Sequence, residues 1–271
     1  MKDRNKRVIN SIFSELNPEN WKRYYKPYQK IIFTSIPSSL FYLRADISSF
    51  VLQNNFCPFN PFMIFDYNIL NSYPKEKIRI ANNTLIKECD EVWVFLKDFT
   101  SLTDGVLFEI NLAESLGKHV KIIDISRMHE IKAHITYENK DYYGYKLLSK
   151  YYPLVYTAYS SKYFYIRMII SKFVLDYNKV PLNPFMSFDY FLAEKIKREL
   201  IYFSNSTFVA KANELWVFGP ISDGVLAEIK LAQSLNKPIR YFKIINSKEI
   251  KEISKDEVEF EDDLEKYKHK L

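Results

Sequence analysis

The octapeptide NPFMIFDY runs from Asn60 to Tyr67, and NPFMSFDY runs from Asn183 to Tyr190. Seven of the eight letters agree, and residue 183 lies 123 positions after residue 60. The match continues beyond the octapeptide, because CDEVWVF (89–95) aligns with ANELWVF (212–218). A repeat period of about 120 residues is that of a domain and not of a solenoid. The sequence is therefore a tandem duplication of a domain-sized unit.

Short apolar runs predict the β-strands of each unit. KIIFTSI (30–36) and PLVYTAY (153–159) are rich in β-branched and aromatic residues. The runs VWVF and LWVF that follow later are continuously apolar, which is typical of strands buried on both faces. HVKIIDI and PIRYFKI close the two units as further strands. Since helical stretches separate these runs, each unit predicts a parallel sheet with right-handed crossovers.

Helices are predicted between the strands. The stretch after the first strand contains Arg44 or Arg167 and ends before Pro58 or Pro181, because proline cannot continue a helix. A second helix is expected to start in the octapeptide. A third begins at the sequence DGVL in both units, and its aspartate is the expected N-cap.

Composition limits the classes of function. The chain has 271 residues and is 47% apolar, which fits two ordinary globular domains. Two cysteines, Cys57 and Cys89, make no disulfide framework, so a reducing cytoplasmic location is expected. No metal is expected, because the four histidines lack ligand spacing, and no cofactor is expected, because the glycines form no dinucleotide or P-loop motif. We see no signal peptide and no long apolar span, so no membrane partner is expected.

Charge is concentrated at the start of the chain. Residues 1–30 hold eight Lys or Arg against three Asp or Glu, whereas the whole chain has a net charge of +6. Contact with phosphate or an acidic partner is one interpretation, but a solvated helix is favoured, and a nucleic-acid partner is not expected. The predicted organisation is a basic helical leader (1–29), a first unit (30–126), a connector (127–152), a second unit (153–246) and a charged, solvated helical tail (247–271).

Polar residues recur where a ligand would bind. In open parallel sheets ligands bind beyond the carboxyl ends of the strands. The turn after the first strand, the octapeptide and the turn before the third helix all meet that edge. Hydroxyls at a helix N-terminus suit a phosphate or a sugar oxygen. The substrate-binding candidates from the first turn and its helix are Thr34, Ser38, Arg44, Thr157, Ser161 and Arg167.

Two glutamates stand out in the third helix. Glu109 and Glu228 lie within its first two turns among apolar neighbours. The positive helix end favours the ionised carboxylate, whereas partial desolvation opposes it. A poorly hydrated carboxylate beside an anomeric carbon is how Asp and Glu nucleophiles work. Spacing alone favours the simpler alternative, in which both glutamates only stabilise the helix dipole.

The segments 89–120 and 212–239 resemble the nucleoside 2-deoxyribosyltransferase-like superfamily. That family has a strand, a short polar turn, a helix with a nucleophilic glutamate, and Lys-Pro-Val before the next strand. The resemblance covers residues 30–125 and 153–244, and the second copy also resembles a small uncharacterised phage and bacterial branch of the family. It implies an α/β fold with two tandem Rossmann-like or flavodoxin-like parallel-sheet units related by pseudo-two-fold symmetry.

The resemblance also implies roles for residues of the third helix. Glu109 and Glu228 would be the nucleophiles. The family's polar residue six places earlier, which helps to hold the sugar, falls on Thr103 and Ser222. The aspartates one place later could share a catalytic role, namely Asp104 and Asp223.

One departure from the family concerns proton transfer. The family's usual aspartate on the preceding helix falls near Asn82 and Asn205, and an amide cannot supply a proton as a carboxylic acid can. Asp66 and Asp189 of the octapeptide are the alternative donors.

The octapeptide itself has two interpretations. Its phenylalanines, Phe62 and Phe185, could stack on a base, although packing in the core is favoured. Alternatively, the octapeptide serves an interface between the two units, since family enzymes are commonly homo-oligomers and a fused pair would form a pseudo-dimer within one chain. Further homo-oligomerisation stays open.

The implied function is cleavage or base exchange at the N-glycosidic bond of a nucleoside or nucleotide, by a transferase or a hydrolase. A non-catalytic nucleotide-binding sensor of the same fold is the alternative that Asn82 and Asn205 favour. An interaction protein acting through the basic leader is the third.

Overall fold

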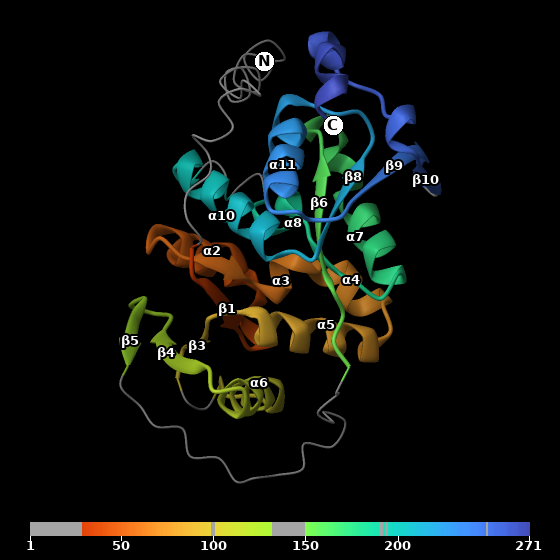
Figure 1. The fold of residues 1–271 in the computed structure, drawn as a ribbon. Helices are drawn as coiled ribbons and strands as arrows, with labels where there is room; N and C mark the ends of the chain where they lie inside the picture. Colours follow the sequence, from red (N-terminus) through yellow and green to blue (C-terminus); the bar gives the residue numbers. More distant parts are fainter. Residues whose placement is uncertain (1–28, 99–100, 132–149, 190–191, 193–194, 248) are drawn as a thin grey trace, which may run out of the picture.

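The computed structural model describes residues 29–98, 101–131, 150–189, 192, 195–247 and 249–271. It contains two α/β units, one in red to yellow-green and the other in green to blue in Figure 1. The predicted basic leader (1–29) lies outside these residues except for Gln29, and so does most of the connector.

The first unit consists, in chain order, of β1 (Ile31–Ser35), η2 (Ser38–Leu43), α2 (Arg44–Gln53), β2 (Cys57–Phe59), α3 (Pro61–Ile64), α4 (Asp66–Ser72), α5 (Lys75–Glu88), β3 (Glu91–Leu96), α6 (Asp104–Ser115), β4 (His119–Asp124) and β5 (His129–Ile131).

The second unit consists of β6 (Leu154–Tyr159), η4 (Ser161–Ile166), α7 (Arg167–Asp176), β7 (Val180–Leu182), α8 (Pro184–Ser187), α10 (Arg198–Lys211), β8 (Glu214–Phe218), α11 (Asp223–Ser234), β9 (Ile239–Asn246), β10 (Glu249–Ile253), η5 (Lys255–Glu257) and η6 (Asp262–Lys270).

Each unit has one mostly parallel sheet, as predicted. The strand orders are β2-β1-β3-β4-β5 and β7-β6-β8-β9-β10, and only the last strand of each sheet runs antiparallel. The prolines expected to end a helix have a second role, because Pro58 and Pro181 lie in the edge strands β2 and β7. Proline is tolerated there since an edge strand has one side that needs no donor.

The C-terminal tail is not the solvated helix that was predicted. It forms β10 and two short 3-10 helices. Apolar side chains in the tail explain the difference. Ile250 and Ile253 pack on the cores beside β9, and Val258 is buried. The tail therefore extends the second sheet.

The N-caps of the third helices lie one residue earlier than predicted. Thr103 caps α6, where its hydroxyl accepts from Val106 N at 3.4 Å, and Ser222 caps α11. Both cap residues have extended backbones. Asp104 and Asp223 are instead the first helical residues, a place where a carboxylate favours the helix dipole.

Reciprocal hydrogen bonds relate the two units by pseudo-two-fold symmetry. Gln29 N donates to Thr207 Oγ1 at 3.2 Å, and Tyr152 N donates to Thr84 Oγ1 at 3.0 Å. A shift of 123 positions converts one bond into the other. The octapeptide helices α3 and α8 also contact each other. Such reciprocity is the mark of an isologous interface, here within one chain.

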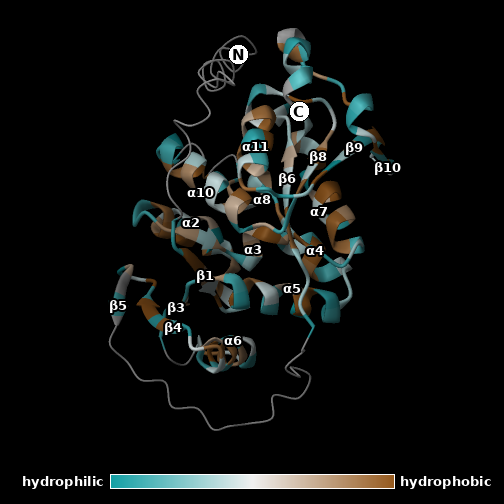
Figure 2. Cartoon of the chain, viewed as in Figure 1, coloured by the Kyte–Doolittle hydropathy of each residue, from teal (hydrophilic) through white to brown (hydrophobic). Residues whose placement is uncertain are grey.

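The largest apolar core runs through both units. It joins β1, α5 and α6 to β6, α10 and α11, whereas smaller cores lie under α2 and α7 on the other faces of the two sheets. In Figure 2 α6, α7 and α11 carry brown and teal residues together, as amphipathic layers do. The two units therefore share one core.

The octapeptide's asparagine is a buried structural bridge. Asn60 Oδ1 accepts from Phe62 N at 3.1 Å and thereby caps α3, while its Nδ2 donates to Arg44 O at 2.9 Å and to Ser48 Oγ at 3.0 Å. Asn183 makes the same three bonds in the second unit. The repeated octapeptide thus fixes α3 against α2 and α8 against α7. Helices α3 and α8 meet at the interface between the units.

Candidate functional site

Each glutamate of the third helices meets a hydroxyl from the first strand. Ser35 Oγ donates to Glu109 Oε2 at 2.5 Å, and Tyr156 OH donates to Glu228 Oε1 at 2.5 Å. Both glutamates are partly exposed residues in the second turn of their helices. Short bonds to a carboxylate are charge-assisted and orient it strongly.

The two copies supply this hydroxyl from different positions. Ser35 corresponds to Ala158 by the shift of 123, and Tyr156 corresponds to Phe33. Residues two apart on a strand face the same side, so the long tyrosine reaches from one step back to the place that serine occupies. The pairing of carboxyl and hydroxyl is therefore present twice although neither donor is repeated.

Burial changes the acidity of both glutamates. It raises the pKa of Glu109 to about 7, against the smaller lowering effect of the bond from Ser35. Burial likewise raises the pKa of Glu228 to about 8, and the hydrogen bond from Tyr156 lowers this pKa by a smaller amount. Desolvation penalises the charged form, which is what a reactive and poorly hydrated carboxylate requires.

These shifts predict a pH-dependent gain in stability on replacing the acid. A folded-state pKa above the unfolded value stabilises the fold at low pH, and this stability is lost as pH rises through the folded pKa. Glu228→Gln should therefore match the wild type at pH 4 and exceed its free energy of unfolding by about 2 kcal/mol at pH 9, a figure discounted for partial exposure. Urea unfolding at both pH values checks this, and equal stability at pH 9 would contradict it.

The threonines of the first strand lie away from the glutamates. Thr34 and Thr157 alternate with Ser35 and Tyr156, so their side chains project from the opposite sheet faces. Both are fully buried, and their hydroxyls have no hydrogen-bond partner among the described residues. The sequence led us to expect that Thr34 and Thr157 would converge with the carboxyls, but their side chains lie on the other face of each sheet.

Two asparagines contribute unpaired acceptors. Asn82 Oδ1 and Asn205 Oδ1 are buried without a hydrogen-bond partner in the described part of the chain. They lie at equivalent positions of α5 and α10, which pack on α6 and α11. A buried acceptor without a donor is costly, so its presence in both copies needs an explanation.

The arginines after the first strands each contact a phenylalanine three residues earlier in the chain. The guanidinium of Arg44 lies 4.1 Å from the ring centroid of Phe41 and donates to its carbonyl, and Arg167 does the same with Phe164. Ser38 and Ser161 begin the 3-10 helices that precede these arginines, as the turn prediction required.

The octapeptide phenylalanines pack against aromatic neighbours. Phe62 makes an edge contact with Phe41 at a centroid distance of 5.0 Å, and Phe185 contacts Phe164 at 5.7 Å. This environment favours the core-packing interpretation. Asp66 accepts from Asn68 N at 3.1 Å. Asp189 is a partly buried residue at the equivalent place of the second copy.

The aspartates at the helix starts project away from the glutamates. Asp104 and Glu109 are five residues apart, which separates their side chains by about 140° around the helix at 3.6 residues per turn. The same holds for Asp223 and Glu228. Thr103 and Ser222 accept a backbone N–H as caps, which leaves their hydroxyl protons for another acceptor.

The lysine after each third helix, which belongs to the family-like pattern, caps the helix before the preceding strand: α5 for Lys118 and α10 for Lys237. Lys118 Nζ donates to Cys89 O at 2.6 Å, and Lys237 Nζ donates to Ala210 O and Ala212 O at 2.8 and 2.7 Å. A cation among terminal helix carbonyls is favourable. The family-like lysine therefore has a structural role.

Removal of this cap should weaken the fold. Lys237→Met keeps most of the aliphatic stem but leaves two carbonyls of α10 without their donor, so we expect the free energy of unfolding to fall by about 1–2 kcal/mol. Thermal unfolding checks this. The exposed Lys75→Met is the control and should change little, and equal effects of the two substitutions would refute the assigned cap.

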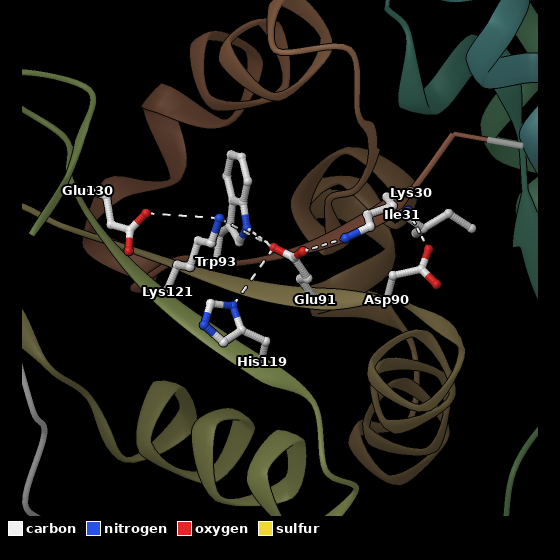
Figure 3. A network of polar contacts seen from close by, with 8 residues as sticks. All are labelled: Lys30, Ile31, Asp90, Glu91, Trp93, His119, Lys121 and Glu130. Carbon is white, nitrogen blue, oxygen red and sulfur yellow. Dashed lines mark hydrogen bonds and ion pairs between the residues drawn. The ribbon is translucent and has the colours of Figure 1, made fainter. Parts of the chain in front are cut away.

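A second polar cluster lies at the amino end of β3 (Figure 3). Glu91 accepts from Trp93 Nε1 and Lys30 Nζ, each at 3.1 Å, and lies 3.6 Å from Lys121 Nζ. Burial raises the pKa of Glu91, but these bonds and the nearby cations outweigh it and leave the pKa below its ordinary value. Glu214 likewise accepts from Trp216 Nε1 at 2.8 Å. The cluster anchors the strand starts, at the end opposite the turn into α6.

Comparison with known proteins gives one match. A family model described as "Domain of unknown function (DUF7768)" matches residues 160–242, which run from the end of β6 into β9 and include Glu228. No curated protein and no solved structure matches the chain. In the part of the chain that the structure describes, no helix combines the length and apolar character needed to cross a bilayer. No group of three or more His, Cys, Asp or Glu side chains there could hold a metal ion.

Proposed function

We propose that the chain cleaves or exchanges the base of an N-glycoside, a nucleoside or nucleotide, with Glu228 and Glu109 as nucleophiles. The supporting observation is the carboxyl–hydroxyl pair, made by Tyr156 in one copy and by Ser35 in the other. A purely dipolar role for the glutamates would need no such donor, and it would not favour a carboxyl whose burial raises its pKa.

The geometry suits a covalent mechanism of two steps. The hydroxyl holds one carboxylate oxygen and leaves the other for attack on the anomeric carbon. The glycosyl ester that forms is then resolved by a second base or by water. In that step the hydroxyl donates to the carboxylate as it departs, which stabilises the developing charge. In this proposal Thr103 and Ser222, the N-caps of the same two helices, hold the sugar.

A nucleotide-binding sensor without turnover is the second candidate. Asn82 and Asn205, with their unpaired buried oxygens, favour it because they can bind a ligand donor but cannot protonate a leaving base.

Base release separates the two. The full chain is incubated with deoxynucleosides, ribonucleosides, their monophosphates and a pyridinium nucleoside, with and without an acceptor base, and free or exchanged base is measured by chromatography. Release or exchange from any substrate supports the proposal. Thermal stabilisation by a ligand that stays intact would replace the enzyme with the sensor.

A further inference from the structure

The contacts that the structure describes for each glutamate of the site include one hydroxyl and no second carboxyl. Retaining glycosidases pair a nucleophile with a second carboxyl about 5–5.5 Å away, which protonates the leaving group. Here the hydrogen-bond partner that the structure gives each glutamate is one hydroxyl. Among the described residues, no second carboxylate influences the pKa of Glu109 or Glu228. The proton that a purine or pyrimidine needs in order to leave therefore has no evident donor.

The neighbouring groups are poor acids. Burial raises the pKa of Tyr156 well above its ordinary value, and its hydroxyl proton is already donated in a hydrogen bond to Glu228. Tyr159, which also senses the charge of Glu228, has a raised pKa for the same reason and donates to Asn183 Oδ1 at 2.7 Å. The partner in the first copy is a serine hydroxyl, which is a weaker acid than an ordinary phenol. The helix-start aspartates project about 140° away.

The buried oxygens of Asn82 and Asn205 indicate what the ligand offers. An amide oxygen without a donor is satisfied by an N–H or O–H group of a bound ligand. A carboxamide NH₂ on the leaving ring would fill it. Asn82 and Asn205 lie on α5 and α10, the helices that pack on α6 and α11, and an amide can accept from such a group but cannot protonate it.

We propose that these sites take N-glycosides whose leaving group is already cationic, a pyridinium carboxamide such as the nicotinamide nucleosides. This rests on the proposed function and deepens it. A carboxylate oxygen of Glu228 or Glu109 bonds to the anomeric carbon while the carbon–nitrogen bond breaks. Its electron pair passes to the ring nitrogen and neutralises the pyridinium, so the base departs neutral without a proton.

The second step returns the enzyme to its starting state. Water adds its oxygen to the anomeric carbon, the ester oxygen leaves as the carboxylate, and the remaining proton goes to solvent. The first step consumes one negative and one positive charge. A poorly hydrated site favours such charge neutralisation, because opposite charges attract more strongly at low dielectric constant.

The test compares nicotinamide riboside with inosine on the full chain. The expected kcat/KM for nicotinamide release is at least ten times that for hypoxanthine release, and nicotinamide release should rise with pH through the glutamate pKa values with no falling limb up to pH 9.5. Hypoxanthine release at a comparable or higher rate would overturn the pyridinium preference and leave the proposed function intact. Release of neither base would overturn the pyridinium preference, and no release from any substrate of the wider panel would overturn the proposed function as well.

A matched substitution tests the missing acid. Asn82→Asp with Asn205→Asp supplies a carboxyl at both places, so the ratio of hypoxanthine to nicotinamide release should rise at least tenfold, with a falling alkaline limb for hypoxanthine only. An unchanged ratio in a variant that keeps the wild-type melting temperature would count against the inference.

Discussion

Replacing Glu228 and Glu109 together by glutamine should reduce base release at least about a thousandfold, which corresponds to about 4 kcal/mol of transition-state stabilisation. Glutamine keeps the shape and still accepts the bond from Tyr156 or Ser35, but its amide cannot form a stable glycosyl ester. The two single variants rank the copies. Chromatography of free base under single-turnover conditions measures the loss.

A matched control lies on the same helix. Glu114 is exposed near the end of α6, and the second copy has Gln233 at its place. Glu114→Gln should therefore leave base release unchanged. If the variant with glutamine at both 109 and 228 releases base as the wild type does, the glutamates are structural and the nucleophile lies elsewhere.

Asn183→Ala should lower the free energy of unfolding by about 3–4 kcal/mol. The substitution leaves four partners without their bonds, namely Phe185 N, Arg167 O, Ser171 Oγ and Tyr159 OH. Buried polar groups that lose a partner each cost about 1 kcal/mol or more, and part of this is recovered by relaxation. Urea unfolding measures the difference.

The first copy provides the internal comparison. Asn60 makes the same bonds except that Ile36 stands where the second copy has Tyr159, so Asn60→Ala should cost less than Asn183→Ala. The exposed Asn54→Ala is the control, with an expected change below about 0.5 kcal/mol. Equal costs at all three positions would contradict the bridging role of the octapeptide asparagine.

Most of the fold could be predicted from the internal repeat. The long apolar strands and the helices of each unit could be predicted because apolar runs and helix-stop residues recur in both copies. The strands β2, β7 and β5 were missed because three residues show no periodicity, and the first two of them include a proline. β10 was missed because its charged residues hide two isoleucines that pack on β9.

The site was predicted only in part, for a physical reason. Glu109 and Glu228 could be selected from their position on apolar helices. Their hydroxyl partners could not, because Ser35 and Tyr156 occupy different places and an alignment of the copies pairs them with Ala158 and Phe33. Thr34 was predicted to bind substrate because a threonine recurs at its place in the second copy. Strand alternation puts its side chain on the other face of the sheet. The geometry of the strand, and not the recurrence of letters, identifies the donors.

The proposed glycosyl ester tests the central claim most directly. The full chain is mixed with nicotinamide riboside and, in parallel, with the deoxynucleoside that releases base fastest, quenched in acid within one turnover, digested and weighed by mass spectrometry. We predict a sugar adduct on the peptide that contains Glu228 or Glu109, absent from the corresponding glutamine variant. Base release without an adduct on either peptide, undiminished in the double glutamine variant, would contradict the account.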